Sequence, residues 1–156
     1  MSRTPLIIDA NLLVLLVVGL ASPAYIIKHK RLQAYLIADF DLLLEIIRAA
    51  PAIIFTPNTL TEASNLAGYV AEPARTQIYR TLGALIAANE ESDIPSASAV
   101  DRHQFLRLGL TDVVLMEATA ESGATLLTVD HDLYQATLVN GGNAINFNHL
   151  RERFTL

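Results

Sequence analysis

Residues 5–19 read PLIIDANLLVLLVVG, and this stretch decides the class of fold. Its first part, residues 5–9, is a short apolar run that ends in an acid, which predicts a buried strand. Residues 11–19 are apolar on every side and end in Gly19, which predicts a buried helix. A buried strand that leads directly into a buried helix is the repeating unit of α/β proteins.

The same alternation continues along the chain. Further strands are predicted at residues 52–55, 124–129 and 144–147, with a short one around Ile94. Helices are predicted at residues 33–50, 73–89, 99–108, 112–122 and 131–138. A further helix is expected to begin at residues 56–59, directly after the second strand, and another to form the tail. Thr111 and Gly123 are expected to cap the helix at residues 112–122. Because parallel strands need crossover connections, we expect an α/β fold: a three-layer parallel sheet of four to five strands with helices on both faces, in a single domain over residues 1–156.

The composition excludes several classes of protein. Of the 156 residues, 52% are apolar and 17% are charged, which excludes disorder and allows a large core. The chain has no Cys, so disulfides, Cys-ligated zinc and thiol catalysis are excluded. Its net charge of -5 excludes a strongly basic surface that binds nucleic acid by bulk electrostatics.

The N-terminal residues imitate a secretory signal peptide. Arg3 precedes the apolar residues 12–21 and the small residues 21–24. Asp9 and Asn11 interrupt the apolar stretch, however, and the run is too short to span a bilayer. We therefore expect a cytoplasmic protein that begins with a buried strand and helix.

Acidic residues fall where the predicted strands end and where helices begin. Asp9 ends the first strand and Asp130 ends the strand at residues 124–129, whereas Glu62 and Asp112 lie in the first turns of helices. In a parallel α/β sheet all four positions can face the carboxyl edge, where such proteins bind ligands, provided that the loops fold the two helix-start acids toward it. Each acid alone has a simpler explanation, because the helix dipole favours acids in a first turn and Asp is a common N-cap.

Together the four acids favour a metal site. We expect Glu62 and Asp112 to lie on apolar helical stripes, where an unpaired carboxylate is costly. Two carboxylates about 5 Å apart repel by roughly 3 kcal/mol at an effective dielectric near 20. The sequence places no Lys or Arg beside them, so a divalent cation is the economical partner, and oxygen ligands select Mg²⁺ or Mn²⁺. Most other acids, Asp39 and Glu117 among them, are expected to be solvated.

The segments around these acids resemble the motifs of PIN-domain nucleases. Residues 6–13 (LIIDANLL) resemble the opening strand motif of that family, and residues 59–62 (TLTE), 110–115 (LTDVVL) and 126–133 (LLTVDHDL) resemble its second, third and fourth acidic sites. The resemblance implies a PIN-like fold and metal-dependent cleavage of RNA, as by a VapC-like toxin of a toxin–antitoxin pair. It also implies roles for individual side chains. Metal ligands would be Asp9, Glu62, Asp112 and Asp130, with Asp132 as an accessory acid and Asn11 and Thr128 as supporting groups.

The expected reaction is hydrolysis of an RNA phosphodiester by a water that Mg²⁺ or Mn²⁺ activates. Basic contacts to RNA are expected from Lys28, Lys30 and Arg31, which belong to the only dense basic run. The all-apolar helix within residues 11–19 suggests a further burial surface, and hence a homodimer or an antitoxin protein as partner.

Two other functions stay open at this point. The chain would act without catalysis if it were a PIN-fold module that binds RNA or another protein. A haloacid-dehalogenase-like phosphatase also begins with a strand that ends in Asp, but it needs Asp-x-Asp, whereas Asp9 is followed by Ala10 and Asn11. We rank that second alternative below the first.

Overall fold

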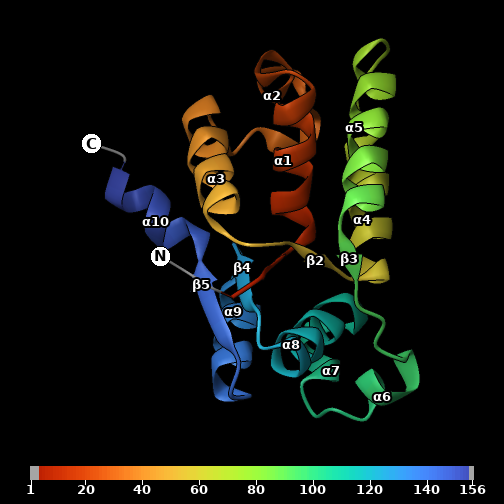
Figure 1. Ribbon diagram of the computed structural model, residues 1–156, viewed down its shortest axis with the longest axis vertical. Coiled ribbons are helices and arrows are strands. Elements are labelled where there is room, and N and C mark those ends of the chain that lie inside the picture. The colour runs from red at the N-terminus through yellow and green to blue at the C-terminus, as the bar shows by residue number, and fades with distance from the viewer. Residues whose placement is uncertain (1–3, 155–156) are drawn as a thin grey trace.

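The predicted opening strand is present as β1 (Leu6–Ile8), and Asp9 connects it directly to α1 (Ala10–Ala21) in the computed structural model, which describes residues 4–154 (Figure 1). Arg3, part of the signal-peptide interpretation, lies outside the described residues. The other elements, in chain order, are α2 (Pro23–Lys28), the 3-10 helix η1 (Lys30–Leu32), α3 (Ile37–Ala49), β2 (Ile54–Phe55), α4 (Pro57–Ala67), α5 (Ala74–Ala88), β3 (Glu90–Glu91), α6 (Ser96–Val100), α7 (Phe105–Leu108), α8 (Leu110–Ser122), β4 (Thr125–Thr128), α9 (His131–Val139), β5 (Asn143–Asn146) and α10 (Phe147–Phe154). The predicted α/β class is confirmed.

The strands form two parallel sheets, so the prediction of one continuous sheet was wrong. One sheet has the order β1-β4-β5, and the other pairs β2 with β3. A single bridge between Leu6 and Ile53 connects them. The bridge lies directly before β2, and β2 itself pairs only with β3 within the described residues. Read across the bridge, the strands lie in the order β3-β2-β1-β4-β5.

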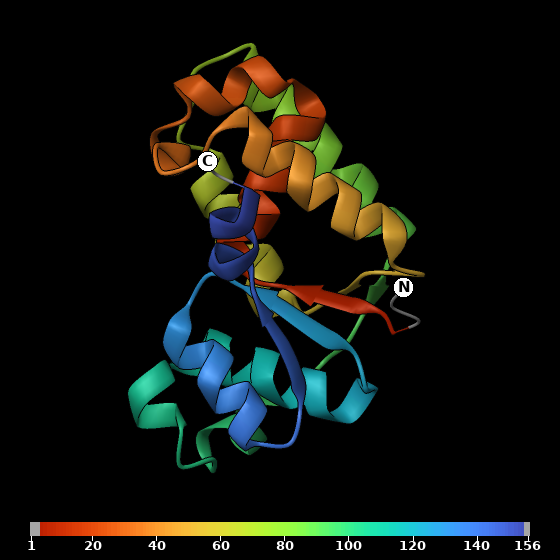
Figure 2. The same cartoon turned by 90° about the vertical axis from the view of Figure 1, so that its left-hand side faces the viewer.

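Alternate residues of the central strands point into two separate clusters of buried side chains. Ile8 and Leu127 pack with α1 and its neighbours, whereas Ile7 and Leu126 pack with α8 and α9. This is the two-residue period of a strand that is buried on both faces. Figure 2 shows the result, with α1 to α5 on one side of the strands and α6 to α9 on the other.

The apolar helix α1 is enclosed by its own chain. Its residues 12–19 are all buried, and it packs against α2, α3, α4 and α5. The expected location of a partner surface on this helix was therefore wrong, because the chain itself covers the helix. The predicted end at Gly19 was also wrong, because α1 continues to Ala21 and Gly19 instead allows close packing against Phe40.

Several predicted helix bounds differ from the observed ones. α3 begins at Ile37 rather than at residue 33, because the Asp39 carboxylate accepts a hydrogen bond of 2.8 Å from the Leu36 N–H and so fixes the first turn. α8 begins at Leu110, since Gly109, with φ 82°, takes the cap position predicted for Thr111. Gly123 ends α8 in the left-handed conformation, as predicted.

Two other segments also differ from the prediction. In place of one helix over residues 99–108, the chain forms α6 up to Val100, a turn, and α7 from Phe105. Ala99 and Gln104 are the only buried residues of that segment, so no continuous apolar stripe spans it. The short strand expected around Ile94 lies earlier, at Glu90–Glu91. In the part of the chain that the structure describes, no helix is long and apolar enough to cross a membrane.

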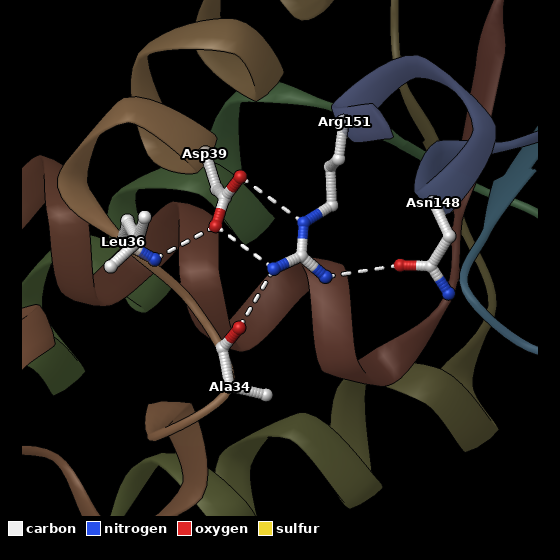
Figure 3. Close-up of polar contacts among 5 residues, drawn as sticks. All are labelled: Ala34, Leu36, Asp39, Asn148 and Arg151. Carbon is white, nitrogen blue, oxygen red and sulfur yellow. Dashed lines mark hydrogen bonds and ion pairs between the residues drawn. The ribbon is translucent and has the colours of Figure 1, made fainter. Parts of the chain in front are cut away.

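Two acids expected to be solvated are ion-paired. Asp39 is 7% exposed and binds Arg151 of α10 (Figure 3). Glu117, on α8, pairs with Arg102. Helical spacing alone gave no sign of either pair, because Arg151 lies on α10 and Arg102 lies in the turn between α6 and α7.

Candidate active site

Asp9 is a buried residue, and both oxygens of its carboxylate accept hydrogen bonds. It is 5% exposed and caps α1, since its Oδ1 accepts a hydrogen bond of 2.9 Å from the Leu12 N–H. Its Oδ2 accepts one of 2.5 Å from the Thr128 hydroxyl and one of 2.9 Å from the Val129 N–H. The capping role considered from the sequence is thus present, but the additional donors from β4 are more than a cap requires.

Thr128 connects Asp9 to the second strand-end acid. Its hydroxyl oxygen accepts a hydrogen bond of 3.0 Å from the Asp130 N–H while the hydroxyl donates to Asp9. Asp130 caps α9 through a bond of 3.0 Å between its Oδ1 and the Leu133 N–H, and its side chain is exposed. Asp132 follows in the first turn of α9 and is also exposed.

The two strand-end acids meet because β1 and β4 are neighbours in the sheet. They pair in parallel from Leu6–Thr125 to Ile8–Leu127, so their carboxyl ends lie side by side. The chain order also reverses between these strands: β2 and β3 lie on one side of β1, and β4 and β5 on the other. Such a reversal is where open α/β sheets form their ligand crevice.

Glu62 and Asp112 line one open pocket of about 730 Å³ between α4 and the start of α8. Asp112 is half-buried there. Glu62 is exposed, so its expected place on an apolar stripe was wrong, because α4 buries Leu60, Ala63 and Ala67 instead. Asp9 and Asp130 do not line this pocket.

The pKa of Asp112 responds to the other three candidate carboxylates. The pKa of Asp112 is raised to about 7, first by burial and then by the negative charges of Asp130, Asp9 and Glu62. Burial likewise raises the pKa of Asp9, against the hydrogen bonds from Thr128, Leu12 and Val129, and Asp130 adds to the rise. No ion pair within residues 4–154 includes any of the four. The negative charges of Asp9, Glu62 and Asp130 thus act on Asp112, and no ion pair within residues 4–154 offsets them.

The four carboxylates are the type of ligand that a hard divalent cation prefers, but they are not assembled around one position. Within residues 4–154, no three acidic or His side chains stand together in an arrangement that holds an ion. The shared four-acid site thus stays a prediction. In its favour, all four donors are carboxylate oxygens, the type that Mg²⁺ and Mn²⁺ prefer. Asp112 supplies the independent observation, because its half-buried carboxylate is surrounded by like charge.

The remaining predicted site residues lie farther out. Asn11 is exposed in the first turn of α1, two residues after Asp9. Lys28, Lys30 and Arg31 are exposed on α2 and η1, and none of them lines the pocket of Glu62 and Asp112.

Asp93 is an acid that the sequence reasoning missed. It is exposed and lines the same pocket as Glu62 and Asp112. Asp93 follows β3 as Asp9 follows β1, at the same edge of the strands. The misplaced strand around Ile94 hid this signal, because it put Asp93 inside a strand rather than after one.

Tyr35 is a second neighbour that the sequence did not reveal. Its pKa is raised to about 12 by burial and by the charge of Asp9, so its phenol stays protonated beside the acids. Arg151 lies 4.8 Å over its ring.

Comparison with protein-family models, curated proteins and solved structures found no match for this chain. The likeness to PIN-domain nucleases therefore rests on the four short motifs and their order.

Proposed function

We propose that this protein is an Mg²⁺- or Mn²⁺-dependent endoribonuclease with a PIN-like, three-layer fold. The observation that carries the proposal is the position of Asp9 and Asp130 at adjacent carboxyl ends of β1 and β4, where the strand order reverses. The pocket lined by Glu62 and Asp112, with its unbalanced negative charge, supports it. Metal ions held by carboxylates hydrolyse phosphodiesters in nucleases through an activated water, without a covalent nucleophile from the protein.

The proposed roles follow from the local geometry. Asp9 is held in one orientation by Thr128 and Val129, so it would be the fixed ligand of the group. Asp130, Glu62 and Asp112 are more exposed than Asp9 and would adjust around the ion, with Asp132 as an outer acid. A bound divalent cation would supply Lewis-acid activation of water and neutralise charge on the phosphate. Asn11, exposed next to Asp9, would orient water or substrate.

A non-catalytic module that binds RNA or protein is the second candidate. The absence of an assembled three-ligand group within residues 4–154 favours it. An antitoxin-like protein or a second copy of the chain, as partner under either function, would need a surface other than α1, which is enclosed. Titration calorimetry with Mn²⁺ separates the two candidates, because a module that only binds RNA or protein does not require the cation.

The decisive experiment is cleavage of a fluorescent RNA by Asp112→Asn protein in Mg²⁺ or Mn²⁺. This substitution removes a repelled charge and no hydrogen bond, so we expect a folded protein with cleavage reduced at least about 100-fold, the loss of roughly 3 kcal/mol of transition-state stabilisation. Asp9→Asn is expected to lose activity as well. Asp41→Asn is the matched control, because Asp41 is an exposed acid on α3. Undiminished cleavage by Asp112→Asn and Asp9→Asn would refute the assignment.

A further inference from the structure

Three pockets lie end to end along α4, and only the first contains the acids discussed above. The second, of about 430 Å³, shares Asn65 with the first. The third, of about 350 Å³, shares Tyr69 with the second. The second and third pockets together, called the basic track below, are lined by Asn65, Gly68, Tyr69, Arg75 and Tyr79, and then by Tyr25, Lys28, Lys30 and residues 70–74.

The geometry of α4 explains why these pockets are continuous. Glu62 and Asn65 are three residues apart on α4, which places them on one side of the helix, and Tyr69 follows the helix end and shares a pocket with Asn65. All three are exposed, and Tyr69 is 50% exposed directly beyond the C-terminal end of α4.

The basic track pairs each of two cations with an aromatic ring. The guanidinium of Arg31 lies 4.5 Å over the ring of Tyr69, and that of Arg75 lies 4.7 Å over the ring of Tyr79. The Tyr79 hydroxyl donates a hydrogen bond of 2.9 Å to the Ser64 carbonyl, which fixes the ring against α4. Planar guanidinium and aromatic groups are the surfaces on which unpaired bases stack.

The charge of the basic track is positive although that of the chain is negative. Three cations line the track, Lys28, Lys30 and Arg75, and a fourth, Arg31, lies over the ring of Tyr69. The one acid in the lining is Glu72. The Glu72 carboxylate is occupied, since it accepts hydrogen bonds from the Thr76 N–H and hydroxyl. The net charge of -5 is therefore distributed unevenly, with a local cationic surface that leads away from the acidic pocket.

We propose that the basic track binds single-stranded RNA, with the strand running from the acidic pocket past Asn65 and its bases stacking at Tyr69 and Tyr79. This inference rests on the proposed nuclease function and specifies its substrate. A duplex does not fit the same chemistry, because its bases are already stacked and present no free ring faces. Arg75, Tyr69 and Tyr79 are thereby assigned to substrate binding in addition to the basic run at Lys28, Lys30 and Arg31.

Binding is measured in EDTA by fluorescence anisotropy, with a labelled single-stranded RNA of about 12 nucleotides, a length that single-strand grooves cover. We expect Tyr69→Ala to weaken binding about tenfold and Tyr69→Phe to leave it unchanged, because stacking needs the ring alone. Arg75→Ala is expected to reduce the slope of log K against log salt by about 0.7, the value for one phosphate contact on a single strand. Arg80→Ala is the matched control, since Arg80 is an exposed cation on α5 that lines neither pocket.

The outcomes separate this inference from the nuclease assignment. Wild-type affinity in both Tyr69→Ala and Arg75→Ala, or equal affinity for a duplex of the same sequence, overturns the track even if Mg²⁺-dependent cleavage is found. Binding that depends on Tyr69 supports the track even if no preparation cleaves RNA. Where cleavage is found, Tyr69→Ala should raise KM and leave kcat near the wild-type value, because Tyr69 lies outside the acidic pocket.

Discussion

Asp112 lies half-buried in the first turn of α8, and the charges that act on it are all negative. The helix N-terminus favours an acid there, but this contribution is small compared with burial beside three other carboxylates. A group of this kind costs the free protein stability. It is retained, in our proposal, because a divalent cation offsets the repulsion when bound.

This cost has a defined pH dependence in metal-free protein. The pKa of Asp112 rises from 3.8 in the unfolded chain to about 7 in the folded protein, so the folded state holds the proton more tightly. The contribution of Asp112 to the free energy of unfolding therefore falls as pH rises from about 4 to about 7. Partial exposure of Asp112 reduces the energy expected from this pKa shift. We therefore expect Asp112→Asn to be more stable than wild type by about 1–3 kcal/mol at pH 8, and equally stable at pH 3.5.

Urea unfolding in EDTA at several pH values measures this difference. Glu121→Gln is a suitable control, because Glu121 is an exposed acid on the same helix. A constant difference between wild type and Asp112→Asn across the whole pH range would contradict the raised pKa. Addition of Mn²⁺ should remove the advantage of Asp112→Asn at pH 8, since only wild type keeps the complete ligand group.

At the level of single residues, the sequence predicted positions better than surroundings. Asp9 and Asp130 were found because a strand that ends in an acid is a local pattern, and the structure places them as expected. The predicted exposure of Glu62 and of Asp39 was wrong, because the exposure of a side chain depends on which helices pack against each other. Arg151 binds Asp39 across 112 residues of sequence, and a pattern of neighbouring residues cannot predict a contact at that separation.

At the level of elements, Gly19 determines how closely α1 and α3 approach. A Cβ at Gly19 would overlap the ring of Phe40, which is 4% exposed in the core. We therefore expect Gly19→Ala to destabilise the protein by about 1–3 kcal/mol through overpacking, although Ala favours a helix by up to about 1 kcal/mol. Thermal and urea unfolding measure the change.

Gly83 provides the matched control for this prediction. It lies inside α5, where a new Cβ would meet nothing within 4 Å. Gly83→Ala should therefore stabilise the protein by about 0.5–1 kcal/mol. Phe40→Leu combined with Gly19→Ala should recover part of the loss, because the smaller side chain vacates the contested space. If Gly19→Ala and Gly83→Ala changed stability in the same direction, the packing argument would fail.

The strands show why elements are easier to predict than sheets. β4 was found within one residue at each end because a continuous apolar run marks a buried strand. β2 and β3 have two residues each, too few for any period to appear, and their pairing was not predicted. A division into two sheets joined by one bridge is a property of long-range pairing, which the pattern of single strands does not determine.

At the level of the whole molecule, α10 connects the end of the chain to α3 and to the strand ends. The Arg151 guanidinium donates to Asp39 at 3.1 and 3.0 Å and to the Ala34 carbonyl at 2.7 Å (Figure 3). It also donates to Asn148 at 3.0 Å, and Asn148 donates in turn to the Val129 carbonyl at 3.3 Å. Because the Val129 N–H binds Asp9, this network supports the backbone that orients the candidate site.

Arg151→Met tests whether this network holds the C-terminal helix in place. The substitution leaves the carboxylate of Asp39 buried at 7% exposure without its cation, so we expect a loss of about 2–4 kcal/mol in the free energy of unfolding. Arg151→Lys should lose less, since it keeps the charge but not the two parallel hydrogen bonds. Hydrogen exchange should become faster in α10 and at Val129 before other segments are affected.

The double variant Asp39→Leu/Arg151→Met distinguishes a stabilising pair from an unpaired charge. If most of the loss in Arg151→Met comes from the buried carboxylate, removal of that carboxylate should restore stability to within about 1 kcal/mol of wild type. Exchange at α10 should still be faster than in wild type, because the contacts to Ala34 and Asn148 are gone in both variants. Protection of α10 equal to wild type in Arg151→Met would show that its apolar contacts alone hold the helix, and the link from the chain end to Asp9 would then have no energetic basis.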